Sequence, residues 1–190
     1  RFSERYHDFI EFLRLEKRYS PHTIRAYEDD LEGFLGFVSD TYAEVPGDIP
    51  ADMIRSWMAD LKKKGISSRS INRKLSTLRS WGKYRLRRVL LLVDPARRVP
   101  APKSGKRLPD FVDLTAMSKL GNQAPFPDTF EGHTQYLIIN LLYTTGIRRS
   151  ELVQLRSVSL DHAACTIKVM GKGGKERIIP LSPELLHQID

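Results

Sequence analysis

Residues 166–181 read TIKVMGKGGKERIIPL, and this stretch decides the fold class. Residues 166–170 and 177–181 have the β-branched composition of strands, and the glycine-rich residues 171–175 between them predict a β-hairpin. Upstream of the hairpin, apolar residues recur instead at helical spacing. The sequence therefore predicts a mainly α-helical protein whose second half is an α+β domain with a small antiparallel sheet.

The hairpin turn is also a candidate phosphate site. Three glycines allow another backbone to approach closely, and Lys172 would stand at the tip. A nucleotide-binding P-loop needs G-x-x-x-x-G-K-[ST] between a strand and a helix, and a dinucleotide loop needs a third glycine where Glu176 stands. Neither pattern is present. A solvent-exposed basic hairpin without a ligand is the alternative interpretation.

A second candidate site lies upstream, in TTGIRRSEL at residues 144–152. Gly146 is expected to end one helix and Ser150 to cap the next. Arg148 would then lie between two rigid helices with its planar fork available to a phosphate, and Glu151 could orient that fork from behind. An ordinary interhelical salt bridge is the alternative.

The first hundred residues predict four helices with short connections, which is typical of a small bundle. Ser20 and Pro21 are a cap and a first helical residue for the second helix. Gly65 is expected to end the third helix, and Ser67 or Ser68 to cap the fourth.

The net charge of +8 is concentrated in one segment. Residues 1–61 carry 7 basic and 13 acidic residues, and residues 108–190 carry 8 and 9. Residues 62–107 carry 16 basic residues and a single acid, Asp94, a net charge of +15. A solvated surface normally mixes both signs, so this concentration indicates a polyanionic partner.

The basic segment includes one face of the fourth helix. Basic and small hydroxyl side chains recur there at steps of four and three, and both types can donate to phosphate oxygens. A membrane-surface helix is disfavoured because the opposite apolar face is needed within the bundle, and an RNA-binding surface would more often expose aromatic residues. We therefore expect a face for double-stranded DNA. Its candidate residues, two of them in the following linker, are Arg69, Arg73, Lys74, Ser76, Ser80, Lys83, Arg87, Lys106 and Arg107.

Residues 99–109, VPAPKSGKRLP, predict a basic linker because three prolines and a glycine oppose a helix. The expected domains are therefore residues 1–98 and 110–190. No apolar run approaches the roughly 20 residues that span a bilayer, and nothing resembles a signal peptide. The single cysteine, Cys165, fits the reducing cytoplasm. No Cys/His spacing suits zinc, so we expect no metal.

Four motifs together resemble the tyrosine site-specific recombinases of the phage integrase family, most closely the bacterial Xer-type group that resolves chromosome dimers. The motifs are YSPHTIRAYEDDL (19–31), SINRKLSTLRSW (70–81), LLYTTGIRRSELVQL (141–155) and VMGKGGKERIIPL (169–181). The resemblance implies a SAM-like core-binding domain followed by the start of a catalytic domain. It also implies double-stranded DNA and further recombinase protomers, assembled as a tetramer, as partners, and no cofactor.

By the same resemblance, Arg148 stabilises negative charge on the scissile phosphate, Glu151 supports it, and Lys172 protonates the departing 5′ oxygen. In the family, an H-x-x-R box and the tyrosine that forms a 3′-phosphotyrosine follow the hairpin. No tyrosine follows the hairpin within these 190 residues, and Tyr136 and Tyr143 precede Arg148. We therefore expect a C-terminally truncated chain that binds DNA without cleaving it. A non-catalytic protein that occupies recombination sites is the alternative.

Overall fold

The chain divides into two compact units, Arg1–Arg107 and Leu108–Asp190, each with its own hydrophobic core. Among the residues described below, no helix is long and apolar enough to cross a membrane. The structure is a computed structural model, and it describes residues 4, 6–42, 46, 48–105, 112–113, 115–117, 119, 126–171 and 173–189.

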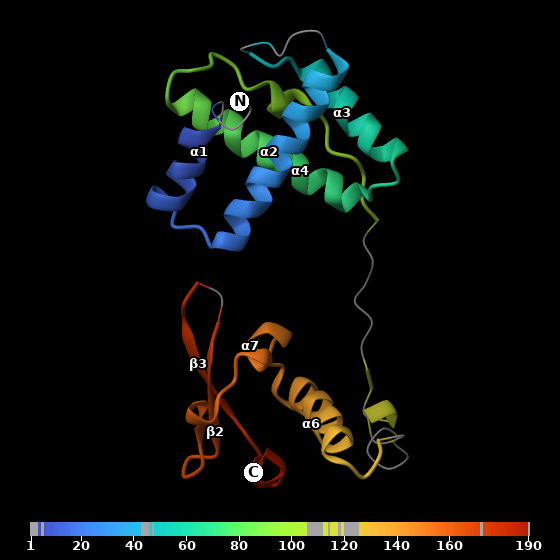
Figure 1. The fold of residues 1–190 in the computed structure, drawn as a ribbon, viewed down its shortest axis with the longest axis vertical. Helices are drawn as coiled ribbons and strands as arrows, with labels where there is room; N and C mark the ends of the chain where they lie inside the picture. Colours follow the sequence, from blue (N-terminus) through green and yellow to red (C-terminus); the bar gives the residue numbers. More distant parts are fainter. Residues whose placement is uncertain are drawn as a thin grey trace. The chain divides into compact units, whose positions relative to one another are not determined.

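The first unit is helical throughout its described elements (Figure 1). The caps expected from the sequence are confirmed, because the Ser20 and Ser67 side chains accept hydrogen bonds from backbone N–H groups three residues on. Gly65 follows the third helix with a left-handed φ of 79°. The elements are α1 (His7–Glu11), the π-helical turn η2 (Phe12–Glu16), α2 (Pro21–Thr41), α3 (Ala51–Lys63), α4 (Ser68–Arg87) and the 3-10 turn η3 (Pro95–Arg98).

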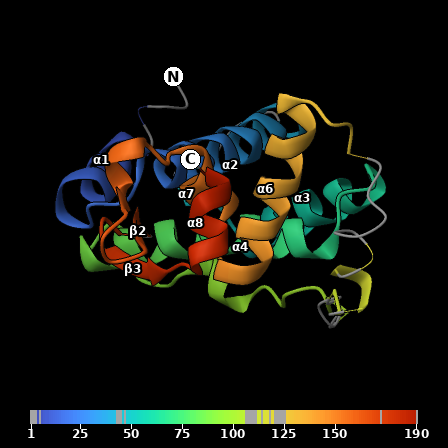
Figure 2. The ribbon, with the colours of Figure 1, turned by 90° about the horizontal axis from the view of Figure 1, so that it is seen from below.

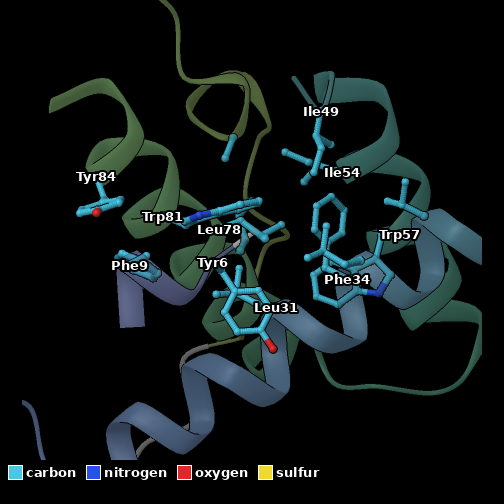
Figure 3. Packing of buried hydrophobic residues seen from close by; sticks show 14 of the residues in the cluster. Tyr6, Phe9, Leu31, Phe34, Ile49, Ile54, Trp57, Leu78, Trp81 and Tyr84 are labelled. Carbon is cyan, nitrogen blue, oxygen red and sulfur yellow. The ribbon is translucent and has the colours of Figure 1, made fainter. Parts of the chain in front are cut away.

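Aromatic side chains from different helices fill the core of this unit (Figure 3). Phe34 of α2 lies against Trp57 of α3, with ring centroids 5.1 Å apart. Phe9 of α1 lies against Tyr84 of α4 at 5.4 Å. Such ring pairs contribute about 0.5–1.5 kcal/mol beyond the area they bury. The apolar side of α4 is thereby fixed in the bundle, which leaves its basic side facing outward.

The first residues of the expected linker pack along α4. Val99 is buried, and its carbonyl oxygen accepts from Nη2 of Arg79 at 2.8 Å. Nδ2 of Asn72 donates to the carbonyl oxygen of Pro102 at 2.9 Å. Residues 106–109, the rest of this segment, lie outside the described part of the chain.

The second unit combines helices with a three-stranded antiparallel sheet of order β1-β2-β3, so the predicted fold class is confirmed. Across the hairpin, Ile167 pairs with Ile179 and Val169 with Arg177. Ile167, Val169 and Ile179 are buried and form a core with residues of α6 and α8. These two helices run side by side (Figure 2). The elements are α6 (Phe130–Thr145), α7 (Arg149–Val153), the 3-10 turn η4 (Ser157–Ser159), β1 (Leu160–Asp161), β2 (Thr166–Met170), β3 (Glu176–Pro180) and α8 (Pro183–Ile189).

Candidate functional site

Arg148 lies in the short connection between α6 and α7. As expected, α6 ends at Gly146, whose φ of 62° is left-handed. Ile147 is buried and anchors the connection. The prediction that Ser150 caps α7 is wrong, because Arg148 itself is the N-cap residue. Glu151 therefore occupies the third helical position, and its Oε2 accepts from the backbone N–H of Arg148 at 2.9 Å.

The carboxylate of Glu151 is the centre of this site, with its side chain only 4% exposed. Its Oε1 accepts from Nη1 of Arg148 at 2.7 Å. Arg177 of β3 binds the same carboxylate with a two-pronged fork, Nη1 to Oε1 and Nη2 to Oε2, both at 2.7 Å. One buried acid thus holds two arginines that come from different elements.

These donors stabilise the charged form of Glu151. The hydrogen bond from Arg177 and then the one from the Arg148 backbone lower the pKa of Glu151 from 4.5 to about 2, although burial opposes the change. The same pairing raises the pKa of Arg177. Both members of the pair are therefore charged at neutral pH.

Arg148 presents most of its guanidinium to solvent. Its side chain is 62% exposed, and among the described residues only Glu151 binds it. The Glu151 carboxylate fixes the guanidinium in place through one of its N–H donors. A guanidinium held in this way can bind an anionic oxygen without first being ordered.

The predicted hairpin is present, and its turn uses glycine where the backbone requires it. Gly173 and Gly174 have φ values of 79° and 72°. The Gly171 N–H donates to the carbonyl oxygen of Lys175 at 2.7 Å and closes the turn. Lys172 lies outside the described residues, and so do the candidate linker contacts Lys106 and Arg107.

Much of the expected DNA-binding face is open on α4. Arg69, Lys83 and Arg87 are exposed and form no ion pair with any residue that the structure describes. Ser76 is exposed and donates to a backbone carbonyl of its own helix. The Ser80 hydroxyl is half-buried, with its oxygen 3.4 Å from that of Tyr27.

Arg73 and Lys74 instead bind a fully buried carboxylate, Asp30 of α2. Asp30 accepts from both Nη atoms of Arg73 at 2.6 and 2.8 Å, from Nζ of Lys74 at 2.8 Å and from the Thr77 hydroxyl at 2.9 Å. The Arg73 fork is therefore occupied, although its side chain is 52% exposed. Removing one partner of a buried ion pair typically costs about 3–5 kcal/mol. These two cations consequently join α2 to α4.

Two residues of the ion pairs described above, Arg177 and Asp30, were not predicted from the sequence. The signal for Arg177 was its place on the strand. Alternation puts it on the same face of β3 as the buried Ile179, while Ile178 is exposed. Asp30 likewise lies among the buried residues on the apolar side of α2. A charged side chain at an inward position marks a buried ion pair.

Two family models match the chain. The phage integrase N-terminal SAM-like domain matches residues 7–88, and the phage integrase family matches residues 122–190. The chain therefore belongs to the phage integrase family, the tyrosine recombinases.

Relatives in this family include Xer proteins. Tyrosine recombinase XerC of Staphylococcus saprophyticus subsp. saprophyticus is 36% identical over 90% of this chain and 57% of its own length. XerC of Thermodesulfovibrio yellowstonii is 39% identical over 92% of this chain and 56% of its own length. XerD of Staphylococcus haemolyticus is 32% identical over 96% and 62%. The chain thus spans less than two thirds of each of these relatives.

Solved structures share the fold. The Tn1549 transposon integrase (residues 82–397), in complex with circular intermediate DNA, has a TM-score of 0.72 at 18% identity and covers 98% of this chain and 62% of its own. A lambda integrase dimer bound to a COC′ core site has a TM-score of 0.69 at 16% identity, covering 93% and 47%. At these identities the likeness concerns the fold alone.

Proposed function

We propose that the whole protein is a site-specific DNA recombinase, and that this chain is the part that binds duplex DNA and carries two catalytic residues. The observation that carries the proposal is Arg148, held by the buried Glu151 with its other donors exposed. In the reaction, a tyrosine hydroxyl attacks the scissile phosphate and forms a 3′-phosphotyrosine. The bond to the 5′ oxygen breaks, and the new ester keeps the bond energy for rejoining.

Each candidate residue has a distinct role in this proposal. Arg148 donates to the phosphoryl oxygens on which negative charge develops, and Glu151 keeps the guanidinium oriented. Lys172 gives a proton to the 5′ oxygen as it leaves. The reaction then needs neither a metal nor a cofactor, because a guanidinium supplies the charge and an ammonium the proton. The tyrosine and the H-x-x-R box would follow residue 190 in the whole protein.

The proposed partners are duplex DNA and further recombinase protomers, four of which would act together on DNA in the cytoplasm. The exposed cations of α4 support the proposal that the chain binds duplex DNA. Arg69, Lys83 and Arg87 share one exposed side of a helix whose other side is locked in the core. We propose that Ser76, Ser80, Lys106 and Arg107 extend this contact.

DNA binding is tested by titrating a labelled duplex with the chain at several salt concentrations. Log affinity should fall linearly with log salt, since neutralised phosphates release counterions. Replacing Arg69, Lys83 and Arg87 with alanine should weaken binding and flatten the slope by about one unit per lost contact. Arg73 is left intact because it holds Asp30.

The matched control is Arg55→Ala, on α3, where Arg55 is paired with Asp52. This variant should keep the wild-type slope. Equal affinity and slope in the triple variant and the wild type would contradict a DNA-binding role for α4.

The alternative is a protein that occupies recombination sites without cutting them. An intact-mass measurement on the native protein separates the two. A mass well above 21.8 kDa supports the recombinase, and a mass of 21.8 kDa supports the alternative.

A further inference from the structure

The guanidinium of Arg177 binds Glu151. Both of its Nη atoms bind the carboxylate, and Arg148 shares Oε1 of the same group. The carboxylate therefore cannot rotate without breaking its bonds to Arg148, in the connection before α7, and to Arg177 of β3. A lysine could not replace Arg177, because a single ammonium cannot form two parallel bonds to both oxygens.

The same guanidinium lies against the start of the hairpin turn. A methyl group built on Gly171 would lie 3.4 Å from Nη1 of Arg177 and 3.8 Å from Oε1 of Glu151. It would also lie 3.1 Å from the carbonyl oxygen of Lys175, to which Gly171 donates. A methyl group here would therefore press on the Lys175 carbonyl oxygen and touch the Arg177–Glu151 pair, so the turn and the ion pair pack closely together. The next residue along the chain is Lys172.

We propose that Arg177 is a positioning residue for Arg148, because it fixes the carboxylate that holds the Arg148 guanidinium. Through Glu151 it orients Arg148, and its guanidinium lies close to Gly171 at the start of the turn. An ion pair that served stability alone would tie α7 to β3 without affecting the rate at saturating DNA. The catalytic part of this inference rests on the function proposed above.

The positioning of Glu151 is measured in this chain, without catalysis. A carbon-detected NMR titration follows the Glu151 carboxyl in the wild type, in Arg177→Gln and in the control Arg156→Ala. The charged groups that border Glu151 are Arg148, Arg177 and the Lys168–Glu176 pair, whose Nζ–Oε2 distance is 2.7 Å. Arg177→Gln should raise the pKa of Glu151 by about 1–3 units, and the control should leave it unchanged.

The catalytic consequence is measured in the whole protein. Single-turnover cleavage of a nicked substrate at saturating DNA should be about 10–100-fold slower in Arg177→Lys, because small displacements of catalytic groups cost rates of this size. DNA affinity should stay near wild type, and the rates are compared well below the melting temperature of the variant, which the lost hydrogen bond to a buried carboxylate should lower. Combined with Arg148→Ala, the Arg177→Lys change should add less than its effect alone, since one residue acts through the other.

Wild-type cleavage by Arg177→Lys, or a full multiplication of its effect in the double variant, would overturn the proposal. If Arg177→Lys fails to fold, the Arg177→Gln variant of the titration is assayed instead and should slow cleavage in the same manner. An unchanged rate in that variant would equally count against positioning. If the wild-type whole protein cleaves no substrate, the recombinase function fails, and the Glu151 titration alone decides the role of Arg177.

Discussion

At the residue scale, Arg148 divides its donors between two tasks. One Nη binds Glu151 and fixes the side chain, and the exposed remainder is available to a ligand. The backbone N–H of Arg148 binds the same carboxylate, so main chain and side chain are held together. This double attachment is the physical basis for treating Arg148 as a preorganised cation rather than as a flexible surface arginine.

A charge-stabilising arginine and a proton-donating lysine should fail in different ways. In the whole protein, Arg148→Ala should lower cleavage roughly a hundredfold or more on any substrate, because charge on the phosphoryl oxygens develops whatever group leaves. Lys172→Ala should be slow on normal DNA but should recover on DNA with a 5′-bridging sulfur, since a thiolate leaves without a proton.

Cleavage rates for both variants on oxygen- and sulfur-bridged substrates check this assignment. DNA affinity, measured in parallel, should persist in each. Rescue of Arg148→Ala by sulfur, with Lys172→Ala still inactive, would reverse the two roles.

Contacts between residues close together in the sequence could be predicted, whereas contacts between distant residues could not. Arg148 and Glu151 are three residues apart, so a local motif indicated that they could interact. Arg177 is 26 residues from Glu151, and Arg73 is 43 from Asp30. These pairings depend on how helices and strands pack. For this reason the free cations of α4 could not be told from the bound ones by sequence alone.

At the element scale, local chemistry determined the starts of α2 and α4, because their serine caps act over three residues. The π-helical turn after α1 was not predicted, since apolar periodicity does not distinguish it from an α-helix. The start of α7 was misplaced because an arginine stands at a position where a serine is usual.

Two helical glycines should respond in opposite ways to alanine. A Cβ at Gly82 on α4 would overlap the Asp94 carboxylate, which caps η3 by accepting from the Ala96 N–H at 2.9 Å. Gly82→Ala should therefore cost about 1–3 kcal/mol through overpacking, despite a better helix propensity. A Cβ at Gly36 on α2 would meet nothing within 4 Å, so Gly36→Ala should stabilise by about 0.5–1 kcal/mol.

Urea unfolding monitored by tryptophan fluorescence measures both changes in the first unit, because Trp57 and Trp81 are the two tryptophans of the chain. A stabilising effect of Gly82→Ala would show that Asp94 moves aside without cost and does not hold η3.

At the scale of the whole molecule, the two candidate sites lie in different units. The open cations are on α4 of the first unit, and the Arg148 site is in the second. Composition and apolar periodicity predicted the helical unit and the α+β unit, because apolar residues recur at different spacings in helices and in strands. The ion pairs within each unit could be identified only from the folded structure.

The 190-residue chain should not form a covalent bond with DNA. Incubation with a nicked suicide substrate should trap no protein–DNA adduct on a denaturing gel, while the whole protein should trap one. Tyr136 and Tyr143 both belong to α6, ahead of Arg148. An adduct formed by the chain alone would contradict the proposed position of the nucleophile, and peptide mapping would then identify the tyrosine.

The first unit also separates its charges along the chain. Residues 1–61, which include α1, α2 and most of α3, carry a net charge of −6, whereas residues 62–107, which include the end of α3 and all of α4, carry +15. Such a unit has a large electric dipole moment, and the field of a DNA duplex should turn it during diffusion so that α4 arrives first. Added salt shortens the range of this field to about 8 Å at physiological ionic strength. Stopped-flow mixing should therefore find an association rate constant that falls steeply with salt; a constant rate would mean that encounters are unguided.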